Sequence, residues 1–162
     1  MAVRLFFLRH GRAMARADWG GDDDLRPLTP EGEAAMARAA RTIAAMDLGL
    51  KVIVTSPLVR ARRTAEIVAE AVGPGLCVVE DERLAGGFDV KALRAVVAEH
   101  GTPKALMLVG HEPDFSTVVG ALIGGGRVVC KKGGLARVDA ADGDLKAAEL
   151  AWLLPPSQLG GG

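Results

Sequence analysis

Short apolar segments recur along the chain and predict the strands of a buried sheet. Three of them, Val3–Leu8, Lys51–Thr55 and Ala105–Val109, are almost continuously apolar. Strands that are covered on both faces of a parallel sheet have this pattern. Four more segments are expected to be strands, namely Cys77–Glu80, Arg127–Cys130, Leu135–Asp139 and Glu149–Leu154. The last two flank a turn-like segment that contains Gly143, which predicts a hairpin near the C-terminus.

Helical patterns lie between these strands. Thr29 is expected to be an N-cap with Pro30 at the first helical position, and this helix should continue to about Met46. Three further helices are expected over residues 58–72, 90–99 and 113–123. Strands that alternate with helices predict an α/β fold, here a three-layer α/β/α domain with a mostly parallel central sheet. We expect this domain to span residues 1–158. The chain from Pro155 is expected to be frayed, and residues 159–162 to form a flexible tail.

Composition narrows the class of protein. A chain of 162 residues fits one domain, and 49% apolar residues are enough for a core. Twenty basic residues balance twenty acidic ones, so no nucleic-acid or membrane partner is expected. No apolar segment reaches the length of a signal peptide or a spanning helix. Cys77 and Cys130 are expected to be buried thiols, which favours a reducing, cytoplasmic location.

The strongest strands end in residues that can carry chemistry. Val3–Leu8 is followed by Arg9-His10, and Ala105–Val109 by Gly110-His111, while Arg60 lies one turn into the helix after Lys51–Thr55. The carboxyl ends of parallel strands meet at one edge, where ligands of open α/β sheets bind. Two histidines and two arginines should therefore share one crevice. Arg60 is in the first turn of a helix, where a basic side chain and the helix N-terminus together favour an anion such as phosphate.

Three motifs make the sequence recognisable. Leu8-Arg9-His10-Gly11 resembles the signature of the histidine phosphatase superfamily, whose fold is phosphoglycerate-mutase-like. Residues 56–61, with the sequence SPLVRA, together with Thr64-Ala65, are similar to its second motif, and residues 109–112, with the sequence VGHE, are similar to its third. The short length and the segment 26–29, with the sequence RPLT, resemble the SixA-type phosphohistidine phosphatases. Asp23 matches an acidic position just before that segment, whereas Arg63 replaces the glutamine of many relatives.

The resemblance implies a role for each matching residue. His10 would be the nucleophile that accepts the phosphoryl group, Arg9 and Arg60 would bind its oxygens, and His111 would complete the phosphate-binding pocket. Phosphoryl transfer needs mainly positioning and positive charge, and the arginine fork binds oxyanions bidentately. Glu82 is the candidate general acid by its position after the third strand. Neither a cofactor nor a metal ion is expected, because no closely spaced pair of metal ligands is present and the arginines would repel a dication.

Several functions are compatible with this pocket. The expected substrate is phosphohistidine on a partner protein, because imidazole is a good leaving group and the short chain has few insertions to enclose a small molecule. The alternative is a phosphomonoesterase that acts on a small phosphorylated metabolite. A phosphate-binding module without turnover is disfavoured because all four pocket residues are present. A mutase is disfavoured because it needs an enclosure that this chain lacks. The sequence does not indicate an oligomeric state.

Overall fold

The computed structural model describes residues 2–160 and contains a six-stranded sheet in the order β3-β2-β4-β1-β5-β6. Its strands are β1 (Val3–Arg9), β2 (Val52–Thr55), β3 (Cys77–Glu80), β4 (Ala105–Gly110), β5 (Leu135–Ala140) and β6 (Ala148–Leu154). The first four are parallel to one another, and β5 and β6 form an antiparallel hairpin beside β1. The predicted parallel sheet and the C-terminal hairpin are therefore confirmed.

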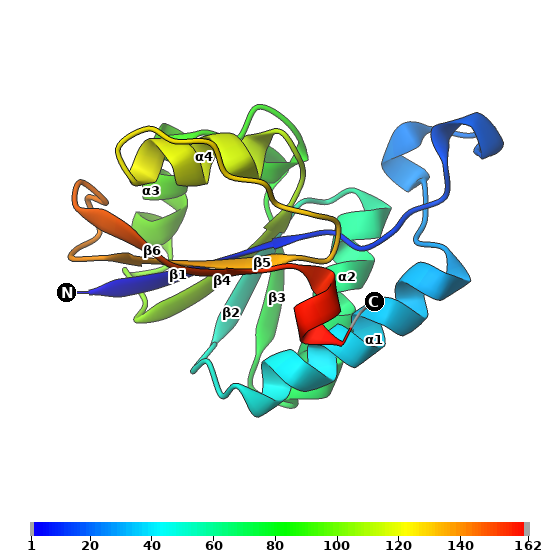
Figure 1. Cartoon of the computed structure of the whole chain (residues 1–162), viewed down its shortest axis with the longest axis horizontal. Coiled ribbons are helices and arrows are strands. Elements are labelled where there is room, and N and C mark those ends of the chain that lie inside the picture. Colours follow the sequence, from blue (N-terminus) through cyan, green and yellow to red (C-terminus); the bar gives the residue numbers. More distant parts are fainter. Residues whose placement is uncertain (1, 161–162) are drawn as a thin grey trace.

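Four helices cover the sheet, two on each face (Figure 1). Helices α1 (Pro30–Ala45) and α2 (Val59–Val72) lie on one face, and α3 (Val90–Glu99) and α4 (Asp114–Leu122) lie on the other. This is the expected three-layer α/β/α arrangement. As predicted, the Thr29 side chain accepts a hydrogen bond from the Gly32 amide and caps α1.

The central strand β1 shows why its sequence is continuously apolar. Leu5 and Phe7 belong to the core beneath α3 and α4, whereas Phe6 and Leu8 belong to the core beneath α1 and α2. All four side chains are fully buried. Successive side chains of a strand point to opposite faces, so a strand between two helical layers needs apolar residues at every position.

The expectations for residues 127–130 and for Cys77 were wrong. Residues 127–130 are not a strand. The backbone of Cys130 bonds to side chains instead of a neighbouring strand: its carbonyl accepts from Arg9 and its amide donates to Ser116 Oγ. Cys77 is exposed, since β3 is an edge strand with one neighbour.

The C-terminal segment is also better packed than expected. Residues Pro156–Leu159 form a 3₁₀ helix, η4, and Leu159 is fully buried against the α1 side of the core. Thr42 Oγ1 donates to the Leu159 carbonyl. The predictions of a frayed chain from Pro155 and of a flexible tail from residue 159 therefore fail through Gly160, whose carbonyl accepts from Arg38 Nε. Gly161 and Gly162 lie outside the described residues.

Candidate active site

The motifs meet at the carboxyl edge of the parallel strands. The register pairs Arg9 with Gly110 on neighbouring strands, and the His10 amide donates to the Gly110 carbonyl at 3.1 Å. On the other side of β4, the Ser56 amide donates to the Val109 carbonyl at 2.9 Å. This backbone alignment brings the His10 and His111 rings to a centroid distance of 5.2 Å. The predicted pairing of the two histidines is therefore found.

His10 is held in one tautomer by the backbone of the next residue. Its Nδ1 lies 2.7 Å from the Gly11 carbonyl oxygen. A carbonyl can only accept, so Nδ1 carries the proton and the lone pair is on Nε2. Burial lowers the pKa of His10 to about 3, and the positive charges of nearby groups contribute to the same direction. The ring is therefore neutral at pH 7, which is the state that a nitrogen nucleophile requires.

His111 is also neutral and is oriented by Ser56. The His111 Nε2 lies 2.7 Å from Ser56 Oγ, and that hydroxyl accepts a hydrogen bond from the Leu58 amide. Burial and the adjacent Arg60 and Arg9 lower the pKa of His111 to about 4. Ser56 thereby fixes the orientation of the His111 ring, and Nδ1 is the other polar atom of that ring. Sequence reasoning included Ser56 in a motif but gave it no role.

The two arginines enter the pocket from different elements. Arg9, at the end of β1, donates from Nη1 to the Cys130 carbonyl at 3.0 Å. Arg60, in the first turn of α2, is only 5% exposed. The Nε atoms of both arginines are buried and have no hydrogen-bond acceptor among the described residues. Buried donors without an acceptor are rare in folded proteins, so these two N–H groups suit an oxyanion ligand.

Asp23 holds the outer face of Arg60. Its carboxylate oxygen Oδ2 lies 3.2 Å from Arg60 Nη2, and its backbone carbonyl accepts from Nη1 at 2.8 Å. The other oxygen, Oδ1, accepts from Arg26 Nε at 2.9 Å. The hydrogen bond from Arg26, with the charge of Arg60, lowers the pKa of Asp23. Asp23 is therefore an ionised positioning group that reaches the site.

A threonine joins the first two motifs. Thr64 Oγ1 accepts from the Gly11 amide at 3.1 Å and donates to the Arg60 carbonyl at 2.7 Å. Gly11 itself leaves no room for a side chain, since a Cβ there would lie 2.5 Å from Met36 Cγ. The signal for Thr64 in the sequence was its place in the second motif, four residues after Arg60 and on the same helix face.

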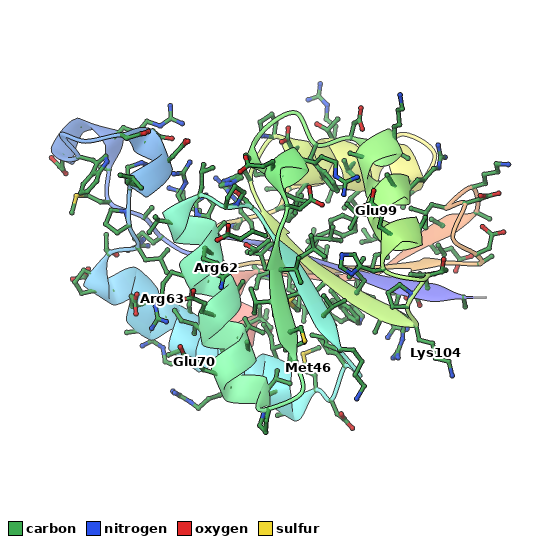
Figure 2. The ribbon with its side chains drawn as sticks, turned by 180° about the vertical axis from the view of Figure 1, so that it is seen from behind. Met46, Arg62, Arg63, Glu70, Glu99 and Lys104 are labelled. Carbon is green, nitrogen blue, oxygen red and sulfur yellow. The ribbon has the colours of Figure 1, made fainter. Side chains whose placement is uncertain are left out.

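Glu82 and Arg63 form no hydrogen bond or ion pair with the two histidines among the described residues. Glu82 begins the 3₁₀ helix η3 (Glu82–Ala85), directly after β3, and is exposed. Its role as general acid stays a prediction. Arg63, the departure from the family pattern, forms a two-pronged ion pair with Glu33 at 2.9 and 3.2 Å. It also contacts Glu70 at 3.0 Å, and both Arg63 and Glu70 are labelled in Figure 2. Arg63 thus connects α2 to α1.

Among residues 2–160, no group of three or more histidine, cysteine or acidic side chains is arranged to hold a metal ion. In the same range, no helix has the length and apolar character needed to cross a membrane.

Solved structures share this fold. The protein histidine phosphatase SixA, in a complex with tungstate, superposes with a TM-score of 0.81 at 23% identity, over 97% of this chain and 99% of that one. A mycobacterial glucosyl-3-phosphoglycerate phosphatase superposes with a TM-score of 0.70 at 19% identity, over 93% and 98%. The fold is thus the phosphoglycerate-mutase-like fold of SixA.

Sequence comparison assigns the family. An uncharacterised protein of Picosynechococcus sp. is 34% identical over 166 residues, which cover 94% of this chain and all of that protein. The protein named "Probable phosphoglycerate mutase GpmB" of Klebsiella pneumoniae is 39% identical over 85 residues, and this match covers 51% of the chain but only 37% of GpmB. Residues 5–86, which contain the first two motifs, match the model of the histidine phosphatase superfamily, branch 1. The chain therefore belongs to the histidine phosphatase superfamily.

Proposed function

We propose that the protein is a metal-independent phosphatase that removes the phosphoryl group from phosphohistidine on a partner protein. The main observation in support of a phosphoryl-binding site is that Arg9 and Arg60 each have a buried Nε–H group without an acceptor among the described residues, beside a neutral His10. The fold shared with SixA, which is a protein histidine phosphatase, supports the choice of substrate.

The reaction would proceed in two displacements. The lone pair on His10 Nε2 attacks phosphorus, and the bond from phosphorus to the substrate's imidazole nitrogen breaks. The substrate ring keeps that electron pair and takes up one proton from solvent, so it leaves as neutral imidazole, and the water of the second step returns one proton to solvent. Water then attacks phosphohistidine-10 and releases inorganic phosphate, which restores His10. Arg9 and Arg60 balance the charge on the equatorial oxygens through both steps. Because these arginines supply the positive charge, we propose that no metal ion is required.

The test compares substrates on one enzyme preparation. A phosphohistidine-carrying protein should be hydrolysed with a higher kcat/KM than p-nitrophenyl phosphate, with or without EDTA. The His10→Ala variant should lose turnover of both and should trap no acid-labile, base-stable phosphoryl group after rapid quenching. Higher turnover of the ester than of phosphohistidine would favour the metabolite phosphomonoesterase. A rate that EDTA abolishes and one metal restores would favour a metal hydrolase.

Glu82 separates the two phosphatase reactions. An alkoxide leaves poorly without protonation, and a positioned acid contributes about 10²–10⁴ in rate. Imidazole leaves more readily, so its departure depends less on an acid. We expect Glu82→Gln to slow ester hydrolysis strongly and phosphohistidine hydrolysis by less than about tenfold. Equal large losses on both substrates would indicate a conventional phosphomonoesterase, and no loss on either would exclude Glu82 as the acid.

A further inference from the structure

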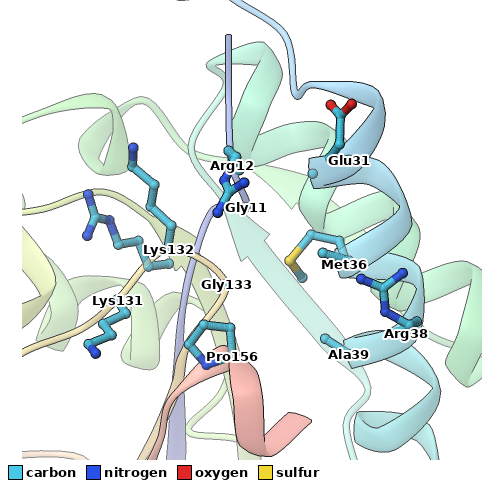
Figure 3. Close-up of a pocket in the computed structure, with 13 residues that line it drawn as sticks. Gly11, Arg12, Glu31, Met36, Arg38, Ala39, Lys131, Lys132, Gly133 and Pro156 are labelled. Atoms are coloured by element: carbon cyan, nitrogen blue, oxygen red, sulfur yellow. The ribbon is translucent and has the colours of Figure 1, made fainter. Parts of the chain in front are cut away.

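A cleft continues from the proposed phosphate pocket along the surface. It has a volume of about 470 Å³ and lies between α1 and the loop of residues 131–133 (Figure 3). Arg9 and Gly11, the two neighbours of His10, form part of its wall, so the cleft opens beside the nucleophile. We call this space the α1 cleft. A cavity of this size is in the range that holds small ligands or a few side chains.

The α1 cleft is basic although the whole chain is electrically balanced. Arg12, Lys131 and Lys132 line it, together with Arg38 from α1, against one acidic residue, Glu31. Figure 3 shows Arg12 at one end of the space, with Lys131 and Lys132 across from α1.

Three cations of the α1 cleft, Arg12, Lys131 and Lys132, differ from the arginines that have acidic partners elsewhere in the described residues. Arg63 is paired with Glu33, and Arg83 with Asp81. In the described part of the chain, Arg12, Lys131 and Lys132 form no ion pair. Partial burial together with the charges of Arg9, Arg26 and Arg12 lowers the pKa of Lys132. This crowding of uncompensated cations favours an anionic ligand.

The arrangement of these cations differs from that of the phosphate pocket. Arg9 and Arg60 place buried N–H groups in one pocket, as a single oxyanion requires. Arg12, Lys131 and Lys132 are exposed and are spread along the cleft. Its floor includes the apolar side chains of Met36 and Ala39, and Pro156 lies at the far end (Figure 3). Several separate positive charges above an apolar floor are complementary to acidic side chains. The carboxylates of such side chains would pair with the cations, and their methylene groups would pack on the apolar floor.

We propose that the α1 cleft binds acidic side chains that flank the phosphohistidine of a protein substrate. This inference rests on the proposed function, because it assigns the part of the substrate that lies outside the phosphate pocket. The cleft would thereby select substrate proteins whose phosphohistidine lies in an acidic surface.

The experiment uses two histidine peptides phosphorylated with phosphoramidate, one with glutamates around the histidine and one with glutamines. The wild-type protein should hydrolyse the acidic peptide with a kcat/KM about tenfold higher than the neutral one, chiefly through KM, and added salt should reduce this ratio. The double variant K131Q/K132Q should bring the ratio close to one. The control K51Q/K104Q removes two lysines from the opposite edge of the sheet and should leave the ratio unchanged.

A binding measurement makes the proposal independent of turnover. Fluorescence anisotropy of a labelled, unphosphorylated acidic peptide should show binding that K131Q/K132Q weakens and K51Q/K104Q does not. If this holds while neither phosphopeptide is hydrolysed, the cleft assignment stands and the proposed activity fails. If both phosphopeptides are hydrolysed equally, the activity stands and the cleft assignment fails. Absence of binding, or tighter binding of oligothymidylate than of the acidic peptide, would also overturn the cleft assignment.

Discussion

Arg60 illustrates how one residue acquires its function from several neighbours. Its place in the first turn of α2 brings it to the carboxyl edge of the sheet, and the Asp23 carbonyl and carboxylate occupy its two terminal nitrogens. The Nε–H remains without an acceptor among the described residues. The guanidinium is therefore fixed in the plane from which it can bind an oxyanion, before any substrate arrives.

Replacement of Arg60 tests this arrangement. Arg60→Ala should reduce kcat/KM by on the order of 10³, as for arginines that stabilise phosphoryl-transfer charge. Arg60→Lys should recover only part of the loss, because a point charge cannot reproduce the fork. Steady-state kinetics with circular dichroism as the folding control would measure both. A loss below about tenfold for the alanine variant would place Arg60 outside the reacting pocket.

Asp23 is expected to act through Arg60. Asp23→Asn keeps the shape and the backbone carbonyl but removes the charge that holds both Arg60 and Arg26. We expect Asp23→Asn to lower kcat/KM about tenfold in the wild-type protein. In the Arg60→Lys variant, Asp23→Asn should lower kcat/KM by less, because the guanidinium that Asp23 holds is already absent. Asp24→Asn is the matched control, since Asp24 is exposed and its carboxylate forms no ion pair among the described residues. Equal effects at positions 23 and 24 would indicate a general charge effect.

At the scale of elements, the sequence best predicted those features that depend on the local pattern of a single strand or helix. The apolar segments ending in Arg9-His10 and Gly110-His111 predicted both strands and their common edge, because the pattern of a buried parallel strand is local. Contacts between elements could not be predicted in this way. The path of residues 127–130 depends on Arg9 and Ser116, and the exposure of Cys77 depends on β3 being at the sheet edge.

The link between β1 and α2 is a further contact of this kind, and it can be removed selectively. Thr64→Val keeps the volume but deprives the buried Gly11 amide of its acceptor, which should cost about 1–3 kcal/mol of stability. The same change frees the Arg60 carbonyl from its hydroxyl donor, so kcat/KM should also decrease. Urea unfolding and kinetics measure the two effects. Thr64→Ser, which retains the hydroxyl, should restore activity more than stability, and equal activity of the valine and serine variants would exclude the link.

At the scale of the molecule, the unfavourable burial of polar and charged side chains occurs at one edge of the sheet. The core on both faces is apolar, whereas the carboxyl edge buries His10, Arg60 and His111 together. Burying polar groups near like charges is unfavourable unless they are hydrogen-bonded or neutral. The two histidines meet this condition by remaining unprotonated, so the stability of the whole fold should depend on pH.

The direction of this dependence follows from the two histidines. Their pKa values are lowered to about 3 for His10 and about 4 for His111, from an ordinary value of 6.5. Between the ordinary pKa of 6.5 and the lowered values, the unfolded chain therefore binds more protons than the folded one. The free energy of unfolding is highest above pH 6.5 and decreases as the pH falls toward 4. Both side chains are buried, so solvent screens the effect little.

Urea unfolding at about pH 7 and about pH 5 measures this effect, and the wild-type protein should lose on the order of 3 kcal/mol between them. The double variant H10N/H111Q should lose much less, because Asn retains a donor for the Gly11 carbonyl and Gln retains a polar group near Ser56, while neither titrates. His100→Gln is the control, since it removes the one histidine outside the site. Parallel pH profiles for wild type and H10N/H111Q would mean that the pocket accommodates protonated histidines, and that the neutral nucleophile is not a consequence of the fold.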